Sequence, residues 1–425
     1  MLISFRYLKV IKVIIHFICR MRLLLLIILL FPCLLIAQPA YVWIERGSEH
    51  MEKKAYSDAI LDFDEAIKKD LKNAKAYSER GRCKQYLNRK DEAIKDFNEA
   101  IKLAPTDFNY FLNRARYYES VNKNTEAIAD FTQAIKLNPK STEAYISEGL
   151  LYMNSKQKNE AEKCFDEAIK LGTRNAKVYQ GKASIAKENG NNDAAFSSYT
   201  KAIELDDNFG QGYFERGELL FIKQKYKEAI IDFNNAEKRN FKSEKLYTLR
   251  AQAKIKQGDL DAALGDLNIV TTAYKSKSAE LYFFIGNAHF MKNDWGAAAK
   301  DYGKAISVKP GYLEAYLERG KCYLLSGKNK YQMAQMDFNQ VLKLKPENEE
   351  AAFGLGKIFF ETNKTEQAIE YLSKSIKQLP NADTYYLRSK CYYKLKKEKE
   401  CCNDLQKAAE LGSKQAKEDI KYVCK

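Results

Sequence analysis

Proline and glycine are scarce in this sequence, and histidine is nearly absent. The chain has 425 residues but only 7 prolines, 20 glycines and 3 histidines. So few residues of the types that bend the backbone or break helices argue against a β-rich or linker-rich chain. The content of 45% hydrophobic and 30% charged residues is that of an ordinary globular protein, and the chain is long enough to bury a large core.

Motifs that carry catalysis or bind metals are also missing. The sequence contains no H-E-x-x-H, no phosphate-binding loop, no G-x-S-x-G and no paired C-x-x-C. These absences remove the usual signals of zinc hydrolases, nucleotide-binding loops, serine hydrolases and zinc ribbons. We therefore expect no catalytic residues, no metal and no cofactor, and we expect the abundant carboxylates to lie on solvated helix faces.

The number of cysteines does not fit a full disulfide framework. Seven follow residue 38, an odd number. Cys83, Cys322 and Cys391 share one position of the repeat described below, as small core residues do. Cys401 or Cys402 with Cys424 is the pair that could form a bridge and tie down the C-terminus.

The net charge of +15 has two interpretations. Removing the five Lys and Arg side chains of residues 1–38 leaves +10 on the remainder. A basic surface can attract an acidic peptide or a membrane. Lys and Glu alternate along most of the expected helices, however, so we favour a solvated Lys-rich helical surface without a specific acidic partner.

The N-terminal 38 residues read as an export segment. Leu23 to Ala37 is an uncharged apolar run of 15 residues that follows Arg22. At 1.5 Å per residue it spans about 22 Å, short of the ~30 Å hydrocarbon core, so a signal peptide fits better than a retained anchor.

Translation starts at Met1 or Met21, and cleavage is expected near Ala37, Gln38 or Ala40. A lipoprotein site at Cys33 is disfavoured because bulky residues precede it. We expect export to the periplasm or cell envelope of a bacterium, with membrane contact only through this segment if it is not cleaved.

A period of about 34 residues runs from residue 40 to the end. Its reference position holds a small residue in every unit. Twelve residues later comes another small residue, usually Ala, and four after that a large apolar one, such as Phe97 or Phe131. Spacings of three and four place these residues on one helical face, where small residues let a second helix approach and the ring fills the space between. The reference residues are Gly47, Gly81, Ala115, Gly149, Ala183, Gly217, Ala251, Gly286, Gly320, Gly356 and Ser389.

Residues that favour turns or end helices divide each unit into two helices. Turn residues such as those at 88–90 and 258–259 fall in the middle of a unit, and prolines such as Pro105 and Pro139 close it. The ninth unit has two extra residues near Lys328–Gln332, which should lengthen its internal turn. The units are about 40–73, 74–107, 108–141, 142–175, 176–209, 210–243, 244–278, 279–312, 313–348, 349–381 and 382–412, with 413–425 as a capping helix.

This pattern resembles the tetratricopeptide repeat family. The second unit shows the motif in full, as Tyr77, Arg80, Gly81 and Lys84, then Ala93, Phe97, Ala100 and Pro105. The resemblance covers nearly all of residues 40–412. It implies an all-α fold: a right-handed α-α superhelical solenoid of about eleven two-helix repeats plus a C-terminal capping helix, which covers the last apolar face. It also implies that the first helix of each repeat lines a concave face that holds a peptide or partner helix.

Positions three before and four after the reference residue form one stripe on the first helices, which is aromatic only in the C-terminal half. The rings could form a groove for an apolar or amphipathic segment, or could simply pack between neighbouring helices. Three lysines beside the rings could hold acidic groups of a ligand, or be solvated. The candidate partner-binding residues are Phe214, Phe221, Phe283, Phe290, Lys321, Phe353, Lys357, Phe360, Tyr386, Lys390 and Tyr393.

Two other site types are not supported. His50 and His289 stand where other repeats have Tyr118 or Tyr323, which indicates packing residues. Some tetratricopeptide proteins grip a C-terminal carboxylate with a Lys, Arg and Asn clamp, but the matching positions carry no such set; Ser78 in the second unit is one of them.

The expected function is a non-catalytic protein–protein interaction scaffold or adaptor of the cell envelope. Its expected partners are other proteins or peptides, which could be acidic or amphipathic. One alternative is a basic helical-repeat protein that binds nucleic acid, although export and the aromatic packing argue against it. A second is a membrane-anchored assembly factor.

Overall fold

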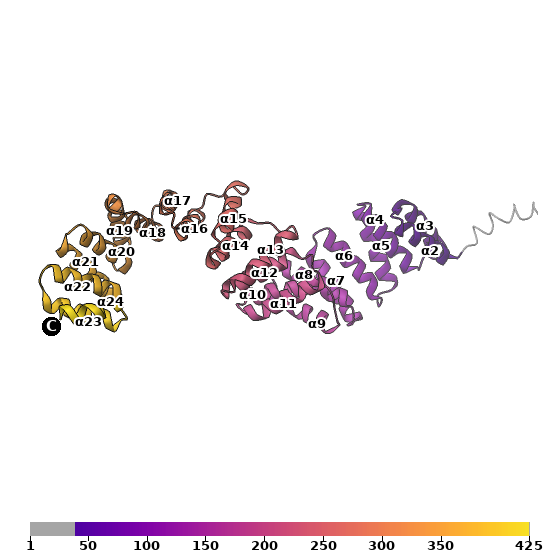
Figure 1. Ribbon diagram of the computed structural model, residues 1–425. Helices are drawn as coiled ribbons and strands as arrows, with labels where there is room; N and C mark the ends of the chain where they lie inside the picture. Colours follow the sequence, from indigo (N-terminus) through magenta and orange to yellow (C-terminus); the bar gives the residue numbers. More distant parts are fainter. Residues whose placement is uncertain (1–38, 425) are drawn as a thin grey trace, which may run out of the picture. The chain divides into compact units, whose positions relative to one another are not determined.

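The computed structural model describes residues 39–424, and the predicted export segment lies outside this range. Within it the chain is all-α, and the described residues form no strand (Figure 1). The helices are α2 (Ala40–Glu52), α3 (Tyr56–Lys69), α4 (Ala74–Tyr86), α5 (Lys90–Leu103), α6 (Phe108–Ser120), α7 (Asn124–Leu137), α8 (Thr142–Asn154), α9 (Lys158–Lys170), α10 (Ala176–Glu188), α11 (Asn192–Leu205), α12 (Gly210–Ile222), α13 (Tyr226–Lys238), α14 (Glu244–Gln257), α15 (Leu260–Thr272), α16 (Ala279–Met291), α17 (Trp295–Val308), α18 (Leu313–Leu325), α19 (Tyr331–Leu344), α20 (Glu349–Glu361), α21 (Thr365–Gln378), α22 (Ala382–Lys394), α23 (Glu398–Glu410) and α24 (Lys414–Val423).

Each 34-residue period contains one helical hairpin. The turn inside the hairpin has one residue in the left-handed region, for example Asn88 (φ 59°) and Gly258 (φ 81°). The next amide then bonds back into the preceding helix, as Arg89 N does to Lys84 O at 2.8 Å. In the ninth repeat, which has two extra residues, the turn contains a short 3-10 helix, η1 (Lys328–Lys330), and is longer, as expected.

Polar caps and prolines set the boundaries between hairpins. Asn73, Ser141 and Asn348 each accept a hydrogen bond from a backbone amide in the first turn of the following helix. Helix α5 ends at Leu103, two residues before Pro105. These caps and prolines lie within a few residues of the helix ends that they define. The hairpin boundaries therefore do not depend on contacts between residues far apart in the sequence.

The core lies between helices, where one large ring meets small residues of two neighbouring repeats. Phe338 of α19 is 1% exposed. A Cβ atom added to Gly320 or Gly354 would lie 2.8 Å or 2.5 Å from that ring. The small residues therefore recur because the helices approach more closely than larger side chains allow.

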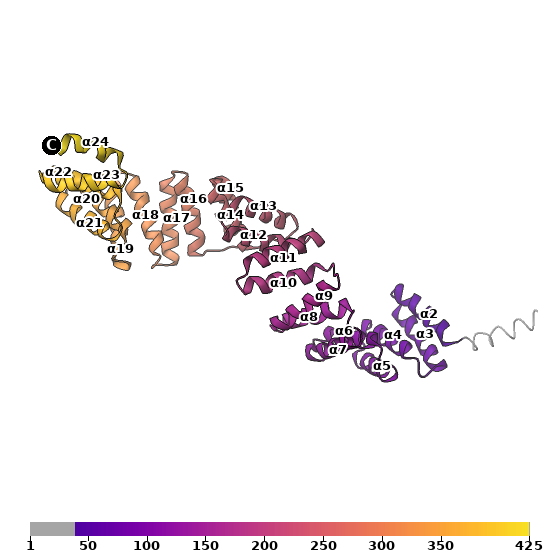
Figure 2. The ribbon, with the colours of Figure 1, turned by 90° about the horizontal axis from the view of Figure 1, so that it is seen from below.

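The described chain divides into two compact units, with the boundary between Ser198 and Tyr199 in the sequence. Within the second unit, α16, α17 and α18 lie side by side (Figure 2). No helix among residues 39–424 is both long enough and apolar enough to cross a membrane.

The last helix, α24, covers the C-terminal end of the repeats. Ala416 is fully buried against a cluster that contains Leu405 and Ala408 of α23. A disulfide joins Cys402 to Cys424, so the predicted bridge is confirmed with Cys402 as the partner. Cys401 is buried as a free thiol.

Many carboxylates are not on solvated faces, so that expectation is wrong. In seven of the repeats an Arg just before the reference residue donates hydrogen bonds to an Asp of the second helix, and these Asp residues are only 3% to 5% exposed. An Arg can also reach the second helix of the preceding repeat, as Arg80 does to Asp64. The pairs are Arg46–Asp62, Arg80–Asp96, Arg114–Asp130, Arg216–Asp232, Arg250–Asp266, Arg319–Asp337 and Arg388–Asp404.

The two described histidines belong to the same polar layer. His50 Nδ1 lies 2.8 Å from Asp62 Oδ2, and His289 Nδ1 lies 2.9 Å from Asp301 Oδ2. They are half-buried, as packing residues are, but each also satisfies a buried carboxylate. The packing interpretation is therefore incomplete.

Candidate functional site

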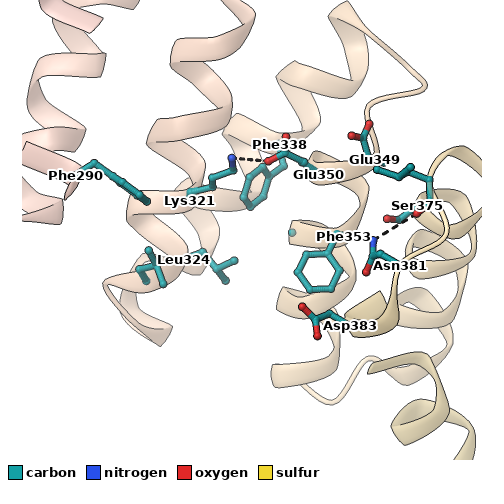
Figure 3. Close-up of a pocket in the computed structure, with 13 residues that line it drawn as sticks. Phe290, Lys321, Leu324, Phe338, Glu349, Glu350, Phe353, Ser375, Asn381 and Asp383 are labelled. Carbon is teal, nitrogen blue, oxygen red and sulfur yellow. Dashed lines mark hydrogen bonds and ion pairs between the residues drawn. The ribbon is translucent and has the colours of Figure 1, made fainter. Parts of the chain in front are cut away.

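A cavity of about 520 Å³ opens between α18, α20 and α22 in the second unit. Figure 3 shows Leu324 of α18 and Phe353 of α20 on opposite sides of it. Phe290 of α16 and Leu379, which follows α21, complete much of the apolar wall. The volume is in the range of sites that hold a ligand side chain or a small molecule.

A second cavity of about 450 Å³ shares Phe290 with the first. Phe221 of α12 and Phe283 of α16 line it, together with Ile255 of α14. The two cavities share Phe290. We call their apolar lining on the first helices the aromatic groove and define it by Phe221, Phe283, Phe290, Leu324 and Phe353. The aromatic stripe of the C-terminal half therefore lies partly open.

Some of the predicted groove residues are packing residues instead. Phe214 is 5% exposed, and its ring stacks on Phe241 at 4.9 Å between centroids. Tyr386 donates a hydrogen bond from its hydroxyl to Asp419 of α24 at 2.9 Å, so it holds the capping helix. For these two positions the interpretation as a partner-binding groove is corrected.

The remaining predicted positions lie outside the aromatic groove. Lys394 Nζ covers the Phe360 ring at 4.0 Å. Lys390 and Tyr393 line a smaller cavity beside the capping helix. Lys357 is half-buried and lines none of these cavities.

Lys321 lines the first cavity, but its positive charge is balanced by two carboxylates of the same chain. Its ammonium donates to Glu318 at 2.8 Å and contacts Glu350 at 2.5 Å. Burial by itself would lower the pKa of Lys321, but these two carboxylates outweigh burial and raise it. The side chain is thus committed to its own carboxylates, and the predicted role of holding acidic groups of a ligand does not fit this geometry.

Residues that the sequence did not single out make the cavity acidic. Glu349 and Asp383 lie in the first turns of α20 and α22 and line the cavity, but neither forms an ion pair with any described residue. Lys321 is the one Lys or Arg among the lining residues of the described chain. No sequence signal marks these carboxylates, because acidic residues are common in first turns.

Ser375 of α21 is the other lining residue that sequence reasoning missed. It is fully buried, and its Oγ is one of two buried side-chain polar atoms without a hydrogen-bond partner among residues 39–424. The corresponding position is Ala or Val in the other ten repeats, so the unusual hydroxyl was visible in the sequence.

No group of three His, Cys, Asp or Glu side chains between residues 39 and 424 is placed to hold a metal. Burial raises the pKa of Cys322 to about 12 and that of Cys391 to about 11, so both stay as thiols at neutral pH and are poor nucleophiles.

The first compact unit, before Tyr199, contains a cavity that is more polar than the two cavities of the aromatic groove. A cavity of about 400 Å³ between α2 and α4 is lined by Lys75, Glu79 and Arg82, with Tyr56 and Tyr86 stacked at 4.6 Å. In the neighbouring repeat, Asn113 donates a hydrogen bond to Ser78 at 2.9 Å. Ser78, one of the positions that match a carboxylate clamp, is thus engaged in an internal contact.

Comparison with known proteins identifies the repeat. Models described as tetratricopeptide repeat match residues 74–107, 112–176, 176–209 and 248–309. A model described as anaphase-promoting complex, cyclosome, subunit 3 matches residues 327–408. The comparison with curated proteins gives no match.

Three solved structures illustrate the likeness in fold. Yeast Tom70 is 15% identical with a TM-score of 0.38, over 84% of this chain and 96% of that one. A tetratricopeptide repeat protein from Parabacteroides merdae is 20% identical with a TM-score of 0.40, over 59% and 98%. YrrB, described as a TPR protein with an unusual peptide-binding site, is 20% identical with a TM-score of 0.33, over 52% and 95%. With its 34-residue hairpins, its ring-and-glycine core and these family matches, the chain belongs to the tetratricopeptide repeat family.

Proposed function

We propose that this chain is a non-catalytic protein–protein interaction scaffold, exported to the cell envelope of a bacterium, that binds segments of its partners in the aromatic groove. The observation that carries the proposal is the first cavity. It exposes Leu325 (44%) and Leu379 (54%) beside the half-buried rings of Phe290 and Phe353. Concave apolar surface of this kind takes up an apolar face of another chain.

Export is supported by two separate features. The apolar run Leu23 to Ala37 follows a basic stretch and is of signal-peptide length. The disulfide between Cys402 and Cys424 belongs to a class of bond that persists in oxidising compartments and is rare in the cytosol.

The test is in-cell crosslinking followed by capture of the protein, with one pair of variants. Leu325→Ser with Leu379→Ser removes exposed apolar surface that lines the cavity. Val308→Ser with Leu344→Ser is the matched control, because these residues are 49% and 43% exposed but line none of the described cavities. Both variants should keep the helical circular dichroism of the wild type.

We expect specific partners to be lost from the cavity variant and kept by the control. If both variants retain the same partners, the first cavity is not the binding surface, and the proposal loses the observation that carries it. The mature N-terminus, read by mass spectrometry of protein from the envelope fraction, tests export separately, and a chain found only in the cytosol would contradict that part.

A further inference from the structure

The chemistry of the first cavity specifies more than an apolar ligand. Its walls are apolar, but its polar lining consists mainly of groups that accept hydrogen bonds or carry negative charge. Glu349 and Asp383 have no ion-pair partner in the described chain, and the charge of Lys321 is compensated by Glu318 and Glu350. Both free carboxylates complement the positive ends of their helices, which explains how the fold tolerates them while leaving their oxygens available.

The buried hydroxyl of Ser375 is an independent indication of a ligand. A buried polar atom without a partner costs roughly 1–3 kcal/mol, so proteins rarely keep one. At the position that matches Ser375, the other ten repeats have Ala or Val. Only in the tenth repeat is a hydroxyl kept at this position, and there it lines the cavity.

Together these observations select one class of occupant. An acidic segment would face uncompensated repulsion from Glu349 and Asp383, and a purely apolar one would leave the Ser375 hydroxyl without a partner. A segment with a large apolar side chain beside Lys or Arg satisfies all three groups. The apolar side chain enters between Leu324 and Phe353, the cation reaches a carboxylate, and an N–H or carbonyl of the segment bonds the hydroxyl.

We propose, building on the binding function proposed above, that the cavity between α18, α20 and α22 recognises a peptide segment of a partner protein in which a large apolar residue is flanked by Lys or Arg. The net positive charge of the sequence left an acidic partner open, whereas the lining of this cavity favours a basic one. Glu349, Asp383 and Ser375 are the specificity-determining residues, and Phe290, Leu324 and Phe353 supply the apolar contact.

The test is selection from a random dodecapeptide display library on the purified full chain, followed by fluorescence anisotropy with the most enriched peptide. We expect enrichment of Leu, Phe or Met next to Lys or Arg. Glu349→Gln with Asp383→Asn should weaken the selected peptide about tenfold and remove the preference for basic residues, while apolar residues are still enriched. Ser375→Ala should weaken it by about fivefold, and it creates the residue that most other repeats carry.

The matched control is Glu366→Gln with Glu398→Gln, which changes the net charge equally in the first turns of α21 and α23, away from the cavity. It should bind as the wild type does. Enrichment of acidic or uncharged sequences, or equal weakening by the control, would overturn the charge assignment while leaving the groove itself in place. Enrichment that is unchanged by Leu325→Ser with Leu379→Ser would instead overturn the proposed function. Self-association that these same substitutions abolish would assign the cavity to a second copy and reject the proposal.

Discussion

Asp266 shows how a single residue holds this fold together. It is 4% exposed, accepts two hydrogen bonds from Arg250, and contacts Lys254 at 2.8 Å. A buried ion pair adds little over well-packed apolar residues, but removing one partner leaves the other charge buried and uncompensated. The polar layer of Arg and Asp residues therefore makes the seven hairpins that carry such a pair sensitive to single substitutions.

We expect Asp266→Ala to lower the free energy of unfolding by about 3–5 kcal/mol. The substitution leaves the charges of Arg250 and Lys254 without the buried carboxylate that they contact. Urea denaturation followed by circular dichroism measures this. Asp261→Ala is the control, since that side chain is 85% exposed and pairs with Lys292 at the surface, where such pairs contribute little. Equal losses in the two variants would show that the buried layer has no special role.

Glu148 marks a repeat in which this polar layer has changed. It takes the place of the Arg, and Cys164 takes the place of the Asp. The carboxylate accepts hydrogen bonds from Thr132 and from Cys164 Sγ at 3.4 Å. Burial raises the pKa of Glu148 although these hydrogen bonds act in the opposite direction.

Because the pKa of Glu148 is higher in the folded chain than in the unfolded one, its protonated form favours folding. The contribution is fully present below the unfolded pKa of about 4.3 and is lost as pH rises through the folded pKa. Between pH 4 and pH 8, we expect Glu148→Gln to gain stability relative to the wild type, because the wild type loses its contribution as Glu148 ionises. Urea unfolding at both pH values checks this, and a difference that does not change with pH would contradict it.

At the scale of the element, the capping helix α24 depends on a covalent link as well as on packing. It is only 10 residues long, and Ala416 is its fully buried residue. Short helices are marginal on their own. The Cys402–Cys424 bridge closes a loop of 22 residues and limits the freedom of the unfolded end.

We expect Cys402→Ser with Cys424→Ser to destabilise α24 by about 3 kcal/mol, from the entropy of closing a loop of this length. Hydrogen exchange of the α24 amides should accelerate, while amides of α16 and α17 stay unchanged. Reductant should have the same effect on the wild type and none on the variant. If the wild type with an intact bridge exchanges as fast as the variant, packing alone sets the stability of the cap.

At the scale of the whole molecule, the hairpins within each compact unit pack chiefly on their neighbours in sequence, so the stability of each unit is approximately a sum of local terms. The repeats are nevertheless not equivalent. In some repeats with Gly at the reference position, the ring lies where a Cβ atom would clash with it, as Phe165 does beside Gly149.

We expect Gly149→Val to destabilise its own hairpin, because an added Cβ would lie 2.7 Å from the Phe165 ring and overpacking costs about 1–3 kcal/mol. Hydrogen exchange should rise in α8 and α9 and stay unchanged in α20 to α23. Gly265→Ala is the control, since nothing lies within 4 Å of its added Cβ. Faster exchange throughout the chain would show that the repeats unfold as one cooperative body.

Most of the architecture follows from the sequence alone. The 34-residue spacing of small residues and rings, the prolines and the turn residues act within one hairpin or between adjacent hairpins, where chain connectivity already decides the contacts. The sequence predicts the residues of the aromatic groove less well. Phe214 and Phe353 occupy the same repeat position, yet Phe214 is covered by Phe241, whereas Phe353 faces a cavity.

The sequence by itself determined the all-α repeat fold, the hairpin boundaries and the family, because these depend on periodicity and short-range contacts. Only the tertiary structure decided that Cys402, and not Cys401, faces Cys424, since adjacent helical residues point in different directions. It alone also decided the charge of the cavity. Glu349, Asp383 and Ser375 come from three different helices, and their combined field exists only where the packing of those helices brings them together.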